Sequence, residues 1–106
     1  MNIEFAAKGV NLSDALKDRV SGKLEKLEKR FGQSLFVRVK FSEAANNQYT
    51  CGIHFNVSGN EFVANTRSDD LFKASDEAMQ KIERQVRKAH DKIEANRGDT
   101  IRGEAP

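Results

Sequence analysis

The residues best suited to chemistry in this 106-residue chain are its lysines and arginines. In the segment KLEKLEKRF, residues 23–31, basic residues recur every few positions, and a second such run, KIERQVRKAHDK, occupies residues 81–92. Basic side chains at helical spacing can neutralise the phosphates of a nucleic acid. They are equally typical of a solvated helix surface that makes i,i+4 ion pairs, such as Glu77 with Lys81.

The charges are sorted to one flank of each predicted helix when residues are placed at 100° steps. In the first helix the basic flank comprises Arg19, Lys23, Lys26 and Arg30, and the opposite flank carries Asp14, Asp18, Glu25 and Glu28. In the second helix the basic stripe comprises Lys81, Arg84, Lys88 and Lys92, opposite Asp76, Glu83 and Glu94, with only Glu77 intruding. Both stripes are displaced from the apolar side in the same rotational sense. On parallel helices they therefore predict one basic side, which the net charge of +2 conceals.

No other constellation predicts a site. Cys51 and His54 have C-x-x-H spacing, but on a strand they face opposite sides, and no second pair completes a zinc site. No phosphate-binding glycine loop or nucleophile motif is present, and His90 lies away from the basic stripe. We therefore expect neither an enzyme nor a bound metal or cofactor.

Composition indicates one globular domain. The chain is 38% hydrophobic and 32% charged, without an apolar run long enough to span a membrane. The first residues lack the pattern of a secretory signal, and the single cysteine cannot form an internal disulfide. Both features favour a reducing cytoplasm.

Hydrophobic alternation predicts the elements that carry these charges. Residues 2–6 predict a first strand, and a helix follows from an N-cap at Ser13 to a C-cap at Gly32. Three more strands are predicted at 35–41, 49–57 and 61–67, as a meander. Ser68 or Asp69 caps a second, longer helix, whose predicted inward residues are Leu71, Ser75, Ala78, Ile82, Val86, Ala89 and Ile93.

The resulting order, β-α-β-β-β-α, predicts an α+β fold with a four-stranded mixed sheet. Each strand has one apolar face, so both helices should cover the same side of the sheet, roughly parallel to each other. A crossover through the first helix makes the first two strands parallel. We expect the domain to span residues 1–95 and residues 96–106 to form a flexible tail.

The segments SDALKDRV with KLEKLEKRF, then three strands, then KIERQVRKAHDKI, resemble the ribosome hibernation-promoting factor family, which includes the ribosome-associated translation inhibitor. The resemblance spans about residues 1–95. It implies a fold similar to double-stranded-RNA-binding domains, placed in the small-subunit channel of messenger and transfer RNA. Family members contact ribosomal RNA chiefly through basic helix residues. Together with the positions of the basic residues around each predicted helix, the resemblance implies these candidate RNA-binding residues: Lys23, Lys26, Arg30, Lys81, Arg84, Arg87, Lys88 and Lys92.

The chain also departs from the family pattern. Leu71-Phe72 stands where many relatives carry Met-Tyr, and the chain leaves no room for the C-terminal dimerisation domain of the long branch. The short, charge-balanced tail favours the short hibernation-promoting branch. The implied partner is the small ribosomal subunit with its RNA, within whole or paired ribosomes. We expect the protein to be a monomer when it is free. The sequence does not decide between two outcomes of binding, the pairing of ribosomes and the inactivation of single ribosomes.

Two alternatives belong to other functional classes. A regulator that binds proteins could use the open sheet face, where we expect Arg38, Lys40, His54, Asn65 and Arg67. A free double-stranded-RNA binder is disfavoured because the turn SGNE, residues 58–61, lacks the basic cluster typical of those domains.

Overall fold

Six elements follow one another in the predicted order in a computed structural model that describes residues 2–32, 34–57 and 59–97, the last eight by backbone alone. They are β1 (Asn2–Lys8), α1 (Asp14–Phe31), β2 (Phe36–Ala44), β3 (Gln48–Val57), β4 (Asn60–Ser68) and α2 (Leu71–Arg97). Helix α2 thus runs two residues past the expected domain boundary, and the rest of the expected tail lies outside the described residues.

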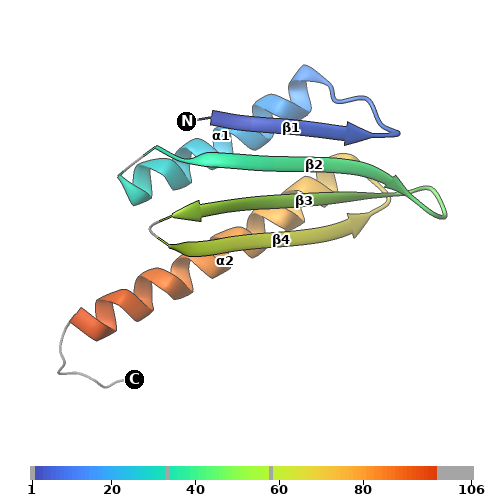
Figure 1. Ribbon diagram of the computed structural model, residues 1–106. Helices are drawn as coiled ribbons and strands as arrows, with labels where there is room; N and C mark the ends of the chain where they lie inside the picture. The colour runs from blue at the N-terminus through green and yellow to red at the C-terminus, as the bar shows by residue number, and fades with distance from the viewer. Residues whose placement is uncertain (1, 33, 58, 98–106) are drawn as a thin grey trace.

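The four strands form one sheet in the order β1-β2-β3-β4, with β1 parallel to β2 and the other neighbours antiparallel. Both helices lie on the same face of this sheet and run in the same direction (Figure 1). The mixed sheet with two parallel helices on one face confirms the predicted fold. The opposite face, which we call the outer face, is covered by neither helix.

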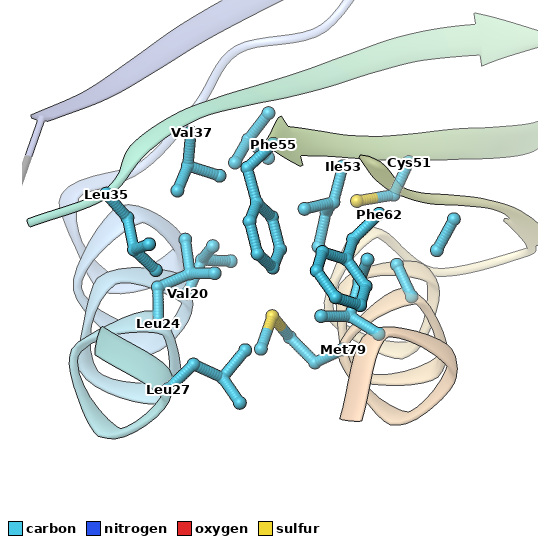
Figure 2. Packing of buried hydrophobic residues seen from close by; sticks show 14 of the residues in the cluster. Val20, Leu24, Leu27, Leu35, Val37, Cys51, Ile53, Phe55, Phe62 and Met79 are labelled. Atoms are coloured by element: carbon cyan, nitrogen blue, oxygen red, sulfur yellow. The ribbon is translucent and has the colours of Figure 1, made fainter. Parts of the chain in front are cut away.

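The core lies between the sheet and the helices (Figure 2). Alternate strand residues enter it, including Val37, Phe41, Cys51 and Phe55, all at most 1% exposed. The predicted inward residues of α2 are confirmed where their side chains are described: the fully buried ones are Ser75, Ala78, Ile82 and Val86, and those partly buried are Leu71 and Ala89. The side chain of Ile93 lies outside the described residues.

Two further residues of α2, Ala74 and Met79, are buried although the predicted stripe omitted them. Met79 lies between the two helices, near Leu27 of α1 and Phe62 of β4 (Figure 2). The contact between helices therefore widens the buried face of α2 beyond the stripe that faces the sheet.

Helix α1 has the predicted caps. The Ser13 hydroxyl accepts a hydrogen bond from the amide of Leu16 at 3.1 Å, and Gly32 adopts the left-handed conformation, with φ of 70°, that ends the helix. The predicted cap of α2 is wrong by one or two residues. Asp70, rather than Ser68 or Asp69, accepts from the amide of Phe72 at 2.7 Å, because its carboxylate directly precedes the first turn.

Helix α2 is fixed against the edge strand β4 by polar contacts. The Gln85 amide group accepts from the Val63 amide at 3.2 Å and donates to the Val63 carbonyl at 2.6 Å, as a neighbouring strand would. The buried Thr66 hydroxyl donates to the carbonyl of Ala74 at 2.6 Å. These contacts set the rotation of α2 and occupy part of an edge that could otherwise pair with another chain.

Asp76 of α2 joins the two helices. Its Oδ1 accepts from Arg19 Nε at 2.9 Å and from Lys23 Nζ at 3.2 Å, and its Oδ2 accepts from Arg19 Nη2 at 2.8 Å. The hydrogen bonds from Arg19, followed by those from Lys23, hold the pKa of Asp76 below its ordinary value, although partial burial opposes this shift. Two cations of α1 therefore share one carboxylate of α2, which balances one of their two positive charges.

We predict that Asp76→Asn lowers the free energy of unfolding by about 1 kcal/mol at pH 7, because one carboxylate holds a two-pronged arginine contact and a lysine contact. A lowered pKa in the folded state stabilises the protein above the unfolded pKa, so the difference from wild type should decrease as pH falls below about 4, through the lowered folded pKa. Urea unfolding at pH 7 and pH 3 measures both values.

Glu77→Gln provides the matched control, since the neighbouring Glu77 side chain is exposed and makes no ion pair with another described residue. It removes the same charge from the same turn and should change stability by less than about 0.5 kcal/mol. An equal loss in both variants, or a loss at Asp76 that is as large at pH 3 as at pH 7, would contradict the assigned contact.

Candidate nucleic-acid interface

The basic flank of α1 faces α2. Arg19 and Lys23 show this directly, because both reach Asp76 across the gap between the helices. The next basic residues of the flank, Lys26 and Arg30, are exposed and make no ion pair with another residue that the structure describes. The cations of this flank that have no ion-pair partner among the described residues therefore lie in its C-terminal half.

The basic stripe of α2 faces away from α1, toward the β4 edge of the sheet. Lys81 Nζ lies 3.3 Å from the carbonyl oxygen of Asn65 on β4, which fixes this orientation. Its exposed side chains are those of Lys81, Arg84 and Lys88, and Arg87 is exposed between Arg84 and Asp76 around the helix. None of these four cations forms an ion pair within the described part of the chain. Lys92 belongs to α2 by its backbone, and its side chain lies outside the described residues.

These two contacts fix the lateral direction of both stripes. The α1 flank points from α1 toward α2, and the α2 stripe points from α2 past β4. Because the helices run in the same direction side by side, both stripes lean toward the β4 side of the molecule (Figure 1). The exposed cations that this arrangement brings to one side of the molecule are Lys26, Arg30, Lys81, Arg84 and Lys88.

The acidic flank of α1 is turned the other way. Glu28 is half-buried, and its Oε2 accepts a hydrogen bond from the amide of Leu35, just before β2, at 3.0 Å. This hydrogen bond lowers the pKa of Glu28. Exposed carboxylates on the same flank, Asp14, Asp18 and Glu25, lie away from α2. The basic residues of α1 thus lie on the side of the helix that faces α2, and its acidic residues lie away from α2.

Sequence reasoning missed the role of Asp76. Its place on the acidic flank of α2 was predicted, yet that flank faces the basic flank of α1, so the carboxylate contacts two cations. The helical-wheel positions gave the direction of each side chain around its own helix. Predicting the contacts of Asp76 also requires knowing on which side of α1 the helix α2 lies. That order follows from the strand order, and combining both signals identifies Asp76, Arg19 and Lys23 as neighbours.

Cys51 and His54 lie on opposite faces of β3, as the alternation predicts. Burial raises the pKa of the Cys51 thiol to about 12. His54 Nε2 lies 2.7 Å from Glu61 Oε2 on the outer face. Within the described ranges, no three metal-binding side chains gather in one place, and no helix is long and apolar enough to cross a membrane.

Comparison with known proteins identifies related chains. Residues 3–94 match the family described as sigma 54 modulation protein / S30EA ribosomal protein. The ribosome hibernation promoting factor of Azotobacter vinelandii is 32% identical over 100 residues, which cover 92% of each chain. The factor of the same name from Escherichia coli (strain K12) is 27% identical over 95 residues, covering 88% of this chain and 97% of that one.

Solved structures agree with this match. The N-terminal domain of Thermus thermophilus Protein Y superposes with a TM-score of 0.73 at 27% identity, over 84% of this chain and 99% of that one. The family match covers nearly all of the described residues and confirms the predicted resemblance. This chain belongs to the sigma 54 modulation protein / S30EA ribosomal protein family.

Proposed function

We propose that this protein binds small-subunit ribosomal RNA in the channel used by messenger and transfer RNA, and that it reversibly inhibits translation by filling that channel. The observation that carries the proposal is the row of exposed, uncompensated cations on α2, namely Lys81, Arg84, Arg87 and Lys88. The names of the Azotobacter and Escherichia relatives, both ribosome hibernation promoting factors, support the ribosome as the partner.

The mechanism is electrostatic and steric. Lysine and arginine side chains displace counterions condensed on RNA phosphates, and arginine can hold a phosphate with two parallel hydrogen bonds. Such contacts position a protein without reading base sequence, so specificity would come from the shape of folded RNA. Translation stops because the space is occupied, and no bond is made or broken.

Rigidity of α2 suits this role. Gln85 and Thr66 fix the helix against β4, so its cations keep a constant spacing relative to the sheet. Preorganised side-chain rows lose less conformational entropy on binding than mobile ones. We infer that α2 provides the main contact and that α1 adds Lys26 and Arg30, while Arg19 and Lys23 hold the helices together. In this proposal the protein acts in the cytoplasm and is a monomer when free.

The first prediction concerns salt. If about five or six phosphates are neutralised, affinity for small subunits should fall by about 10³-fold between 50 mM and 200 mM salt. Sedimentation with purified subunits across a salt series measures this slope. An affinity that changes by less than about tenfold over that range would show that the basic stripes are not the contact surface.

A second prediction separates the flanks. Arg84→Glu with Lys88→Glu should abolish binding to small subunits while leaving the fold intact, because exposed substitutions usually cost about 0.5 kcal/mol or less. Two single variants, Lys88→Glu and Lys17→Glu, provide a matched comparison of binding, because each reverses one charge. Lys17 lies on the flank of α1 that faces away from α2. Equal loss from these two single variants would refute the one-sided interface.

The third prediction tests occlusion by order of addition. The purified protein should inhibit a cell-free translation reaction, and ribosomes preloaded with messenger and initiator transfer RNA should be inhibited less. Lys26→Glu with Arg30→Glu should inhibit more weakly than wild type, because repulsion replaces attraction to phosphate. Inhibition that is independent of the order of addition would rule out competition for the channel while leaving RNA binding intact.

A further inference from the structure

The outer face of the sheet carries a hollow of about 410 Å³. Its lining includes Arg38, Lys40, Thr50, Gly52, His54 and Asn65, all from the three strands β2, β3 and β4. The strand register aligns Lys40, Gly52 and Asn65 in one row across the sheet. No helix covers this face (Figure 1), so the hollow is open to solvent on the side opposite the basic helix stripes.

Gly52 accounts for part of this shape. A Cβ atom built at Gly52 would lie 2.8 Å from Oδ1 of Asn65, which is closer than real side chains approach. The glycine therefore lets the Asn65 amide group lie across β3, beside Lys40 in the register. The floor of the hollow thus offers a polar amide next to a cation, together with the linked hydroxyls of Ser42 and Thr50.

The charge of the outer face is positive after its ion pairs are assigned. Glu4 lies 3.1 Å from Arg38, and Glu61 lies 2.7 Å from His54, so these two carboxylates stand against the four outer-face cations Lys8, Arg38, Lys40 and Arg67. Lys40 is exposed and makes no ion pair with a described residue. Arg67 donates only to neutral acceptors, Gln48 Oε1 at 2.6 Å and the Ala45 carbonyl at 3.3 Å. Two cations in and beside the hollow therefore keep their charge uncompensated.

An exposed aromatic ring lies on the same face, four residues along β2 from Lys40 and beside the ion-paired Arg38. Phe36 is 55% exposed, although it stands on a strand whose inward residues are fully buried. It precedes Arg38 by two residues and so shares the outer face with it. An exposed aromatic next to a cationic groove is the combination with which proteins bind single-stranded nucleic acid, because bases stack on the ring while phosphates follow the cations.

We propose that the outer face binds a single strand of RNA, as a second nucleic-acid site distinct from the helix stripes. Lys40 and Arg67 contact phosphates, and Phe36 stacks on a base. A protein partner fits less well, since the exposed large apolar residues among the described outer-face positions are Phe36 and Val63 alone, too few for the apolar centre of a protein interface. The inference concerns this chain alone and stands independently of ribosome binding.

The test uses the full chain and a fluorescein-labelled 12-nucleotide oligouridylate at low salt, followed by fluorescence anisotropy. Lys40→Gln with Arg67→Gln should weaken binding at least tenfold and reduce the magnitude of the log–log salt slope by about 1.4, since each lost phosphate contact on a single strand contributes about 0.7. Lys17→Gln with Lys29→Gln removes the same charge from α1 and should change affinity less than twofold.

Phe36→Ala separates stacking from charge. It should weaken binding by roughly tenfold and leave the salt slope unchanged, because it removes a ring and no cation. Phe72→Ala is the matched control, since Phe72 is 39% exposed on α2, the helix side of the sheet, and its removal should have no effect. Circular dichroism of each variant confirms that the fold is retained.

Three results would overturn the proposal. The wild-type chain could fail to bind the oligonucleotide, the sheet and control variants could weaken binding equally, or oligoglutamate of the same length could compete as well as unlabelled oligouridylate. The last result would assign the face to an acidic protein segment. The helix variant Arg84→Glu with Lys88→Glu should keep at least half of the wild-type affinity for the oligonucleotide, which separates this site from the ribosome contact.

Discussion

The structure depends on one constraint, namely that the sheet has a single apolar face. Alternate residues of β2, β3 and β4 are buried to within a few per cent, and most of the residues between them are polar. Both helices must therefore cover the same side, and because each follows a strand of the same direction they run parallel (Figure 1). This arrangement turns two separately sorted charge patterns toward one side and leaves the other face of the sheet in water.

The contact between the helices redistributes the roles of the cations. A half-exposed ion pair adds little stability by itself, but Asp76 engages two basic residues at once, one of them through two atoms of its guanidinium group. Arg19 and Lys23 thereby hold the helices in register, whereas Lys26, Arg30 and the described cations of the α2 stripe make no ion pair with another described residue. The overall excess of only two positive charges therefore understates how unevenly charge is distributed.

Much of the fold could be read from local patterns. Alternation of apolar residues predicted every strand, and Ser13 and Gly32 marked the ends of α1 because their side chains and backbone freedom suit those positions. The cap of α2 was misplaced because Ser68, Asp69 and Asp70 are all good capping residues in succession. Asp76 and Met79 depend on the distance between two helices far apart in the sequence, which no local pattern contains.

The position of β1 has a consequence for motion. Strands β2, β3 and β4 are joined by short turns, whereas β1 pairs only with β2 and reaches it through the whole of α1. Its inward residues Ile3 and Phe5 are only partly buried, so less apolar surface holds it than holds the meander. Opening of β1 therefore costs less free energy than unfolding of the whole chain. Its amide hydrogens should exchange with solvent sooner than those of β3, which lies between two strands.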